Sequence, residues 1–218
     1  MTLLFILAIT IGIRHAFEPD HVAAVLTVST QSNSLSATAK QGAIWGVGHT
    51  ITLFIFSMVL MGLNIKIDGS VFLLFEFIIG LVLIWMGLDV VNKSKVLFYG
   101  GETKNTKSSV HPKNDETKLT LKLLSVGLLH GAAGSGVIIA LITTTIDSIY
   151  LKFTYIALFS IGLIICMSLL SILMTMPLHH RMKIIPFRYF KAITGILALL
   201  IGMKILYQSS AQIGTLFI

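Results

Sequence analysis

Five ionisable side chains fall within eight residues of an apolar segment near the start of the sequence: Arg14, His15, Glu18, Asp20 and His21. Imidazole nitrogens suit Ni, Co, Cu and Zn ions, whereas sites for Mg²⁺ and Ca²⁺ use oxygen ligands. His15 and His21 are therefore candidate ligands of a transition metal. Asp20 is either a further ligand or a carboxylate that orients an imidazole by accepting its other N–H. Glu18 is the remaining acidic candidate.

Pro19 stands inside this segment and disturbs any helix that runs through it. Proline has no N–H, so the carbonyl of His15 loses its helical partner, and the residue before proline is pushed away from helical geometry. In an unbroken helix His15 and His21 would lie on different faces. We expect a kink that brings them together beside a cavity. The alternative is a loop between two short segments, but residues 2–13 alone are too short to span a membrane.

Two more histidines, His49 and His130, lie in apolar segments beside glycines, at 46–49 and 130–136. Small residues let helices approach closely, and packing alone accounts for most of the glycines. An ionisable group inside a membrane segment is functional by default, the alternative being a hydrogen-bonded core histidine. We therefore add both histidines to the candidate ligands.

Other polar groups are weaker candidates. His111 falls in a polar stretch where we expect it to be solvated, and His179 and His180 follow an apolar segment where we expect an interface. Glu76 and Lys204 lie near the ends of two apolar segments, where they could pair, or Lys204 could extend its ammonium group to the interface.

The segments that carry these residues are long and apolar. Of the 218 residues, 55% are hydrophobic and 11% are charged, whereas soluble domains have roughly a quarter charged residues. The apolar runs are near 20 residues long and lack strand-like alternation, which favours helices. We predict an all-α membrane bundle of about six transmembrane helices. Their ranges are 2–28, 42–63, 71–91, 120–145, 153–176 and 189–207.

The basic residues predict the orientation of the chain. Twelve of the 16 Lys and Arg residues fall in loops on one side of the predicted spans and three on the other. The positive-inside rule then places the polar linker 92–119 in the cytoplasm and both termini outside, and it accounts for the net charge of +7 without nucleic acid. The halves 1–91 and 120–218 would have opposite orientations, as in an inverted repeat.

The segment HAFEPDH, from His15 to His21, matches the HX4DH signature of nickel/cobalt transporters. Its Glu-Pro form, followed by Val-Ala-Ala-Val, resembles the UreH-type branch of the NicO group, often labelled urease accessory or nickel transport proteins. Segments 46–50 and 130–135 resemble that branch's second and fourth-span motifs. The resemblance covers most of the chain outside the linker. It implies uptake of Ni²⁺, with Co²⁺ as the second candidate, and makes His15, Asp20 and His21 critical.

Four functions are compatible with these observations. We prefer a secondary transporter that carries Ni²⁺ through the cytoplasmic membrane as its substrate, without a resident cofactor. The same scaffold could export the metal or a small anion, or deliver nickel to a urease or hydrogenase, whose maturation proteins would then be partners. A membrane metalloenzyme with Glu18 as base is disfavoured because HExxH is absent. The sequence lacks a GxxxxGK[ST] motif, so a P-loop ATPase is not expected. No sequence feature specifies an oligomeric state.

Overall fold

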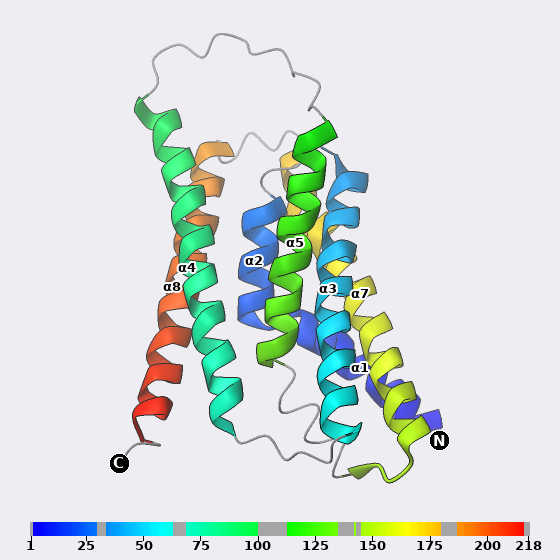
Figure 1. Cartoon of the computed structure of the whole chain (residues 1–218). Coiled ribbons are helices and arrows are strands. Elements are labelled where there is room, and N and C mark those ends of the chain that lie inside the picture. Colours follow the sequence, from blue (N-terminus) through cyan, green and yellow to red (C-terminus); the bar gives the residue numbers. More distant parts are fainter. Residues whose placement is uncertain are drawn as a thin grey trace.

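The computed structural model describes residues 2–29, 34–62, 69–99, 113–134, 142, 145–179 and 187–215. Every regular element in these ranges is a helix, which confirms the predicted all-α class (Figure 1). The helices are α1 (Thr2–Ala16), α2 (Pro19–Ser29), α3 (Leu35–Gly62), α4 (Gly69–Tyr99), α5 (Lys113–Gly134), α7 (Ile149–His179) and α8 (Phe187–Thr215).

Four of the described helices are long and apolar enough to cross a membrane. The qualifying segments are Leu35–Met61, Leu73–Asn92, Ile149–Met176 and Ala192–Gly214. Helices α1 and α2 meet the same criterion only as a pair bent by 56°, which would make a fifth span. Helix α5 begins among charged residues, and residues 135–141 beyond it lie outside the described ranges. The count of six spans therefore stays a prediction.

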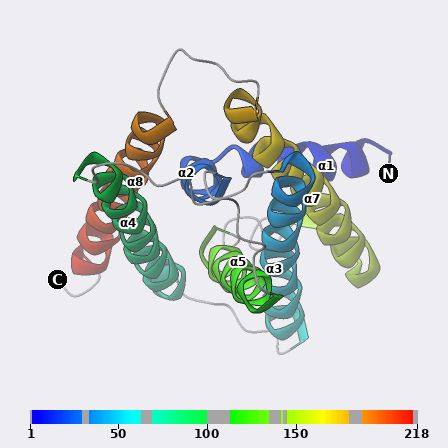
Figure 2. The same ribbon diagram turned by 90° about the horizontal axis from the view of Figure 1, so that it is seen from above.

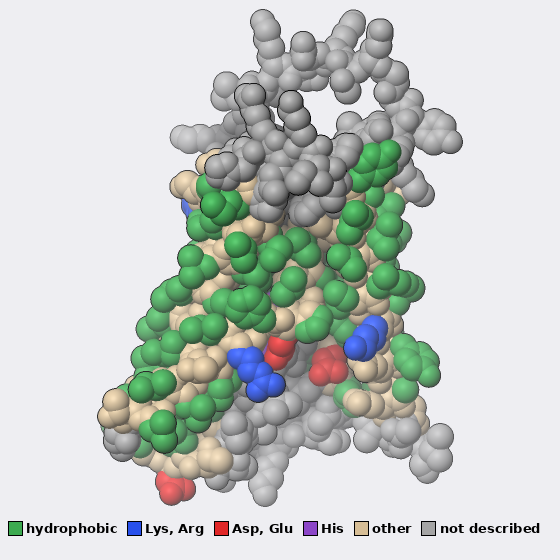
Figure 3. All heavy atoms as spheres, turned by 180° about the vertical axis from the view of Figure 1, so that it is seen from behind, with side chains coloured by type: hydrophobic (Ala, Val, Ile, Leu, Met, Phe, Trp, Pro, Cys, Tyr) green, Lys and Arg blue, Asp and Glu red, His purple; other side chains and the backbone are tan. Residues whose placement is uncertain are grey.

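Helix α2 lies between two groups of helices. Seen from above, α4 and α8 pair on one side of it, and α3, α5 and α7 gather on the other (Figure 2). Helix α3 packs against both α5 and α7, and α1 packs against α7. Hydrophobic side chains cover much of the outer surface (Figure 3), as a lipid-facing surface requires. The break between α1 and α2 thus falls at the centre of the bundle.

The α4–α8 pair is closely packed because glycines face each other across it. A Cβ atom on Gly80 would lie 3.1 Å from the carbonyl oxygen of Gly202, and one on Gly202 would lie 2.8 Å from that of Gly80. Gly87 and Gly195 face each other in the same way, at 2.7 and 3.0 Å. No larger residue fits these positions without separating the helices, which is the usual role of small residues in membrane bundles.

Candidate metal site

The predicted break in the first apolar segment is confirmed, and it spans only Phe17 and Glu18. The N–H of Glu18 donates to the carbonyl of His15 (3.0 Å), which closes the last turn of α1. The carbonyl of Glu18 accepts the N–H of Val22 (3.0 Å), the first bond of α2. Pro19 is the first residue of α2, where its missing N–H would have had no helical partner. The carbonyl of His15, which we expected to lose its partner, is therefore satisfied.

Three imidazole rings meet at this break. The ring centroids of His15 and His21 are 4.7 Å apart, and His49 from α3 lies 5.1 Å from His15 and 5.3 Å from His21. One nitrogen from each ring can be chosen so that all three lie within 4.8 Å of one another. Nitrogens bound to one metal at 2.0–2.1 Å would lie about 3–4 Å apart. Small side-chain shifts would therefore let one ion contact all three rings.

The nitrogens of this cluster are buried and mostly unpartnered. Both ring nitrogens of His15 and of His49, and Nε2 of His21, have no hydrogen-bond partner among the described residues. The three side chains are at most 2% exposed, so bulk solvent does not reach them. Each unsatisfied buried polar group costs about 1–3 kcal/mol. Each neutral imidazole offers one lone pair, so the three rings together form a donor set that suits a transition-metal ion.

Two carboxylates border the cluster in different ways. Oδ1 of Asp20 accepts a hydrogen bond from Nδ1 of His21 (3.2 Å), so that ring presents the lone pair of Nε2. This is the carboxylate–histidine arrangement that orients metal ligands, and it favours the orienting role for Asp20. Oε1 of Glu18 lies 2.9 Å from Nδ1 of His15 without hydrogen-bond alignment, and the Glu18 side chain is 48% exposed.

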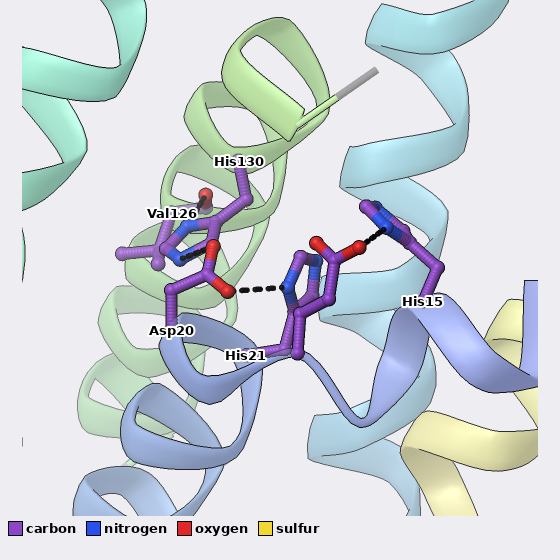
Figure 4. Close-up of polar contacts among 6 residues, drawn as sticks. His15, Asp20, His21, Val126 and His130 are labelled. Atoms are coloured by element: carbon purple, nitrogen blue, oxygen red, sulfur yellow. Dashed lines mark hydrogen bonds and ion pairs between the residues drawn. The ribbon is translucent and has the colours of Figure 1, made fainter. Parts of the chain in front are cut away.

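His130, on α5, lies on the other side of Asp20 and His21 from His15 (Figure 4). Its Nδ1 donates to the carbonyl of Val126 (3.0 Å), so the neutral ring carries its lone pair on Nε2. That nitrogen is buried, has no hydrogen-bond partner, and lies 4.0 Å from Oδ2 of Asp20. His130 is thus adjacent to the three-histidine cluster rather than part of it.

The aromatic walls of the site were not expected from the sequence. The Trp45 ring stacks on His21 (centroids 5.8 Å apart, interplanar angle 12°) and meets His130 edge-on at 5.1 Å. Phe159 on α7 packs against His15 at 5.6 Å. The position of Trp45, four residues before His49 on one helix, was the available signal, because residues at this spacing share a face. These rings keep the imidazoles dry.

A cavity of about 320 Å³ lies next to the cluster, between α2, α4 and α8. Its polar lining consists of three carboxylates, one amine and one amide, and isoleucines of α4 and α8 complete the wall. The polar residues are Glu18, Asp20, Glu76, Lys204 and Gln208.

The remaining predicted histidines fall at or beyond the limits of the described residues. His111 and His180 lie outside the described residues, and His179 is described only as the last residue of α7. In the glycine-containing segment 130–136, residues 135 and 136 also lie outside the described ranges.

Comparison with known proteins gives two matches. Residues 1–89 match the NicO family, described as high-affinity nickel-transport protein. Over 209 residues the chain is 31% identical to the urease accessory protein UreH of Bacillus sp. (strain TB-90), an alignment that covers 93% of this chain and 90% of that protein. No solved structure matches the chain.

Proposed function

Since the chain belongs to the NicO family of nickel-transport proteins, in its UreH-like branch, we propose that it carries Ni²⁺ into the cell across the cytoplasmic membrane. Nickel is the substrate, and Co²⁺ is the second candidate. The observation that carries the proposal is the buried, unpartnered set of nitrogens on His15, His21 and His49. A dehydrated cation would find there the ligands that replace its water.

The chemistry of the site suggests how the ion is driven and released. Imidazole binds metal only when neutral, so protons compete with the ion for the same nitrogens. An inside-negative membrane potential favours inward movement by about 2.3 kcal/mol per charge per 100 mV. Asp20 would hold the His21 ring in its ligating orientation, and Glu18 would stand at the exposed edge of the cluster.

The glycine contacts support two inverted halves that rock around this site. In the α4–α8 pair, Gly80 and Gly195 are 115 residues apart, as are Gly87 and Gly202. Shifting Gly80 forward and Gly202 back by this offset therefore gives the other contact, that of Gly195 with Gly87. In an inverted repeat, equivalent residues of the two halves are expected to make equivalent contacts, with the two helices exchanged.

The same offset relates two further helix pairs. A Cβ on Gly12 (α1) would meet the carbonyl of Phe159 (α7), and one on Gly127 (α5) would meet that of Trp45 (α3). The two glycines are 115 residues apart and the two aromatic residues 114. The reciprocal contacts, Gly162 with Ile9 and Gly48 with Leu124, follow the same offsets. His15 and His130 are likewise 115 residues apart, the same offset as that of the packing contacts.

Uptake by purified protein in liposomes tests the proposal. We expect uptake of radioactive nickel, with Co²⁺ and Zn²⁺ compared as competitors, and we expect it to fall to background in His21→Ala because one of the three donors is lost. His111→Ala, in the predicted linker, serves as the matched control and should retain uptake. Nickel uptake by intact cells, but not by inverted vesicles, would fix the direction as import. Equal uptake by His21→Ala and the unsubstituted protein would contradict the proposed site.

Nickel delivery to an enzyme is the second candidate, because the relative is itself named a urease accessory protein. In that case the predicted linker would dock the maturation proteins. Deleting residues 100–112 and measuring nickel uptake and urease activation separately distinguishes the two functions. If the chain acts only as a transporter, the deletion leaves both nickel uptake and urease activation intact. If it also delivers nickel, the deletion abolishes activation while uptake continues.

A further inference from the structure

The cavity between α2, α4 and α8 shares a wall with the imidazole cluster. Glu18 and Asp20 both line the cavity, and each also contacts a histidine: Glu18 lies 2.9 Å from His15 and Asp20 lies 3.2 Å from His21. These two carboxylates therefore link the wall of the cavity to the ring nitrogens. In the predicted orientation this end of α4 and α8 faces outward.

The size of the cavity suits a hydrated ion, whereas the cluster suits a bare one. A volume of about 320 Å³ corresponds to roughly ten water molecules at about 30 Å³ each. The rings of His15, His21 and His49 are packed against one another and against Trp45 and Phe159, without such space. An incoming ion would keep its water in the cavity and lose it at the rings.

Glu76 is the one acidic lining residue that takes no part in the cluster. It lies on α4 within the apolar span Leu73–Asn92, where an ionisable side chain is costly unless it serves a purpose. Lys204 lines the same cavity, yet the ion pairs described there join Glu18 and Asp20 to histidines rather than Glu76 to Lys204. Figure 3 shows acidic and basic side chains close together on an otherwise largely hydrophobic face.

An independent observation at the inner wall points to a cation. Nε2 of His130 and Oδ2 of Asp20 face each other at 4.0 Å (Figure 4), and the nitrogen is fully buried without a hydrogen-bond partner. In the neutral ring both atoms offer lone pairs, so they repel unless a positive charge lies between them. Metal–nitrogen and metal–oxygen bonds are each about 2.0–2.2 Å long, so an ion on the line between the two atoms would be within bonding distance of both.

From these observations we propose that the cavity is the entry vestibule for a hydrated divalent metal ion, and that the Glu76 carboxylate captures the ion there before it reaches the histidines. The inference rests on the proposed transport function. Glu76 raises the local concentration of the cation, and Lys204 opposes it so that the ion does not stay bound. The ion then passes between Asp20 and His130 to the cluster.

Removing the two charges should have opposite effects on nickel uptake by proteoliposomes. We expect Glu76→Gln to raise the half-saturating nickel concentration about tenfold, by loss of Coulomb attraction, with a maximal rate within about twofold of that of the unsubstituted protein. Lys204→Met should lower the half-saturating concentration. High salt should shrink both effects, because it screens exposed charges. Unchanged half-saturation in Glu76→Gln would overturn the proposal.

Chemical modification after folding separates charge from shape. Cys166 is the only cysteine and is buried, so Glu76→Cys can be studied in a Cys166→Ser background. An anionic methanethiosulfonate reagent should restore the low half-saturating concentration, and a cationic one of similar size should raise it further. Equal effects of the two reagents would show a steric role and would overturn the proposal.

The outcomes also separate this inference from the function on which it rests. If the unsubstituted protein takes up no nickel, the proposed function fails. If it takes up nickel and the Glu76 variants match it in half-saturation and salt dependence, only the vestibule is wrong.

Discussion

At the scale of single residues, the site depends on which imidazole nitrogens are left without protons or partners. Among the described residues, the three-histidine cluster has one side-chain hydrogen bond, which joins Asp20 to Nδ1 of His21 and leaves Nε2 of that ring free to bind. The sequence left Asp20 either as a ligand or as an orienting carboxylate. The 3.2 Å contact favours the second role, so a variant of Asp20 should lose less metal affinity than a variant of His21.

We expect Asp20→Asn to weaken metal binding by about 10–100-fold, the usual effect of losing a carboxylate behind a ligating histidine. His21→Ala should abolish uptake, since it removes a ligand. Nickel titration of the purified protein, with uptake measured in parallel, gives both quantities. A complete loss in Asp20→Asn, equal to that in His21→Ala, would assign Asp20 as a direct ligand in the cluster.

Residue types and spacing could predict much of this site. His15, His21 and His49 were candidates because ionisable groups are expensive in apolar segments, and the break was expected from Pro19. The separate position of His130 could not be foreseen, because it depends on how α5 packs beside α3. Trp45 was overlooked because an aromatic residue in an apolar helix normally signifies packing.

At the scale of elements, the geometry depends on how closely helices approach one another. Helix α5 can lie against α3 beside the cluster because Gly131 has no side chain: a Cβ there would collide with the backbone of His49. The glycines were expected to be packing residues, but the helices they join could not be predicted, since the partners are more than 70 residues away along the chain.

Substitution of Gly131 by alanine should therefore displace His49 and reduce nickel uptake. Overpacking of this kind costs about 1–3 kcal/mol, so the variant should also unfold at a lower temperature in detergent. Gly214→Ala is the matched control, because a Cβ there meets nothing within 4 Å and alanine favours a helix over glycine by about 1 kcal/mol. If both variants behave alike, the close approach at Gly131 is not what positions the cluster.

At the scale of the whole molecule, composition predicted a helical membrane protein, and the helices long enough to span a membrane agree. Sequence alone gave only a faint sign of two related halves, because few side chains are shared between them. The proposed relation rests instead on backbone contacts at glycines such as Gly80 and Gly195, which depend on the three-dimensional packing.

The 115-residue offset has a consequence for the far side of the membrane. Applied to Glu76 on α4 it gives Lys191 on α8, and Lys204 on α8 corresponds to Asp89 on α4. Under this offset an acid of α4 corresponds to a base of α8, yet α4 itself carries an acidic residue toward each end of its span, Glu76 and Asp89. If the two halves are related as proposed, the exit on the cytoplasmic side would therefore also present an acid of α4 to the ion. Asp89→Asn should then slow the efflux of nickel from preloaded inside-out vesicles, whose outer face is the cytoplasmic one. With a saturating nickel load, Glu76→Gln should leave that efflux within about twofold of the rate of the unsubstituted protein.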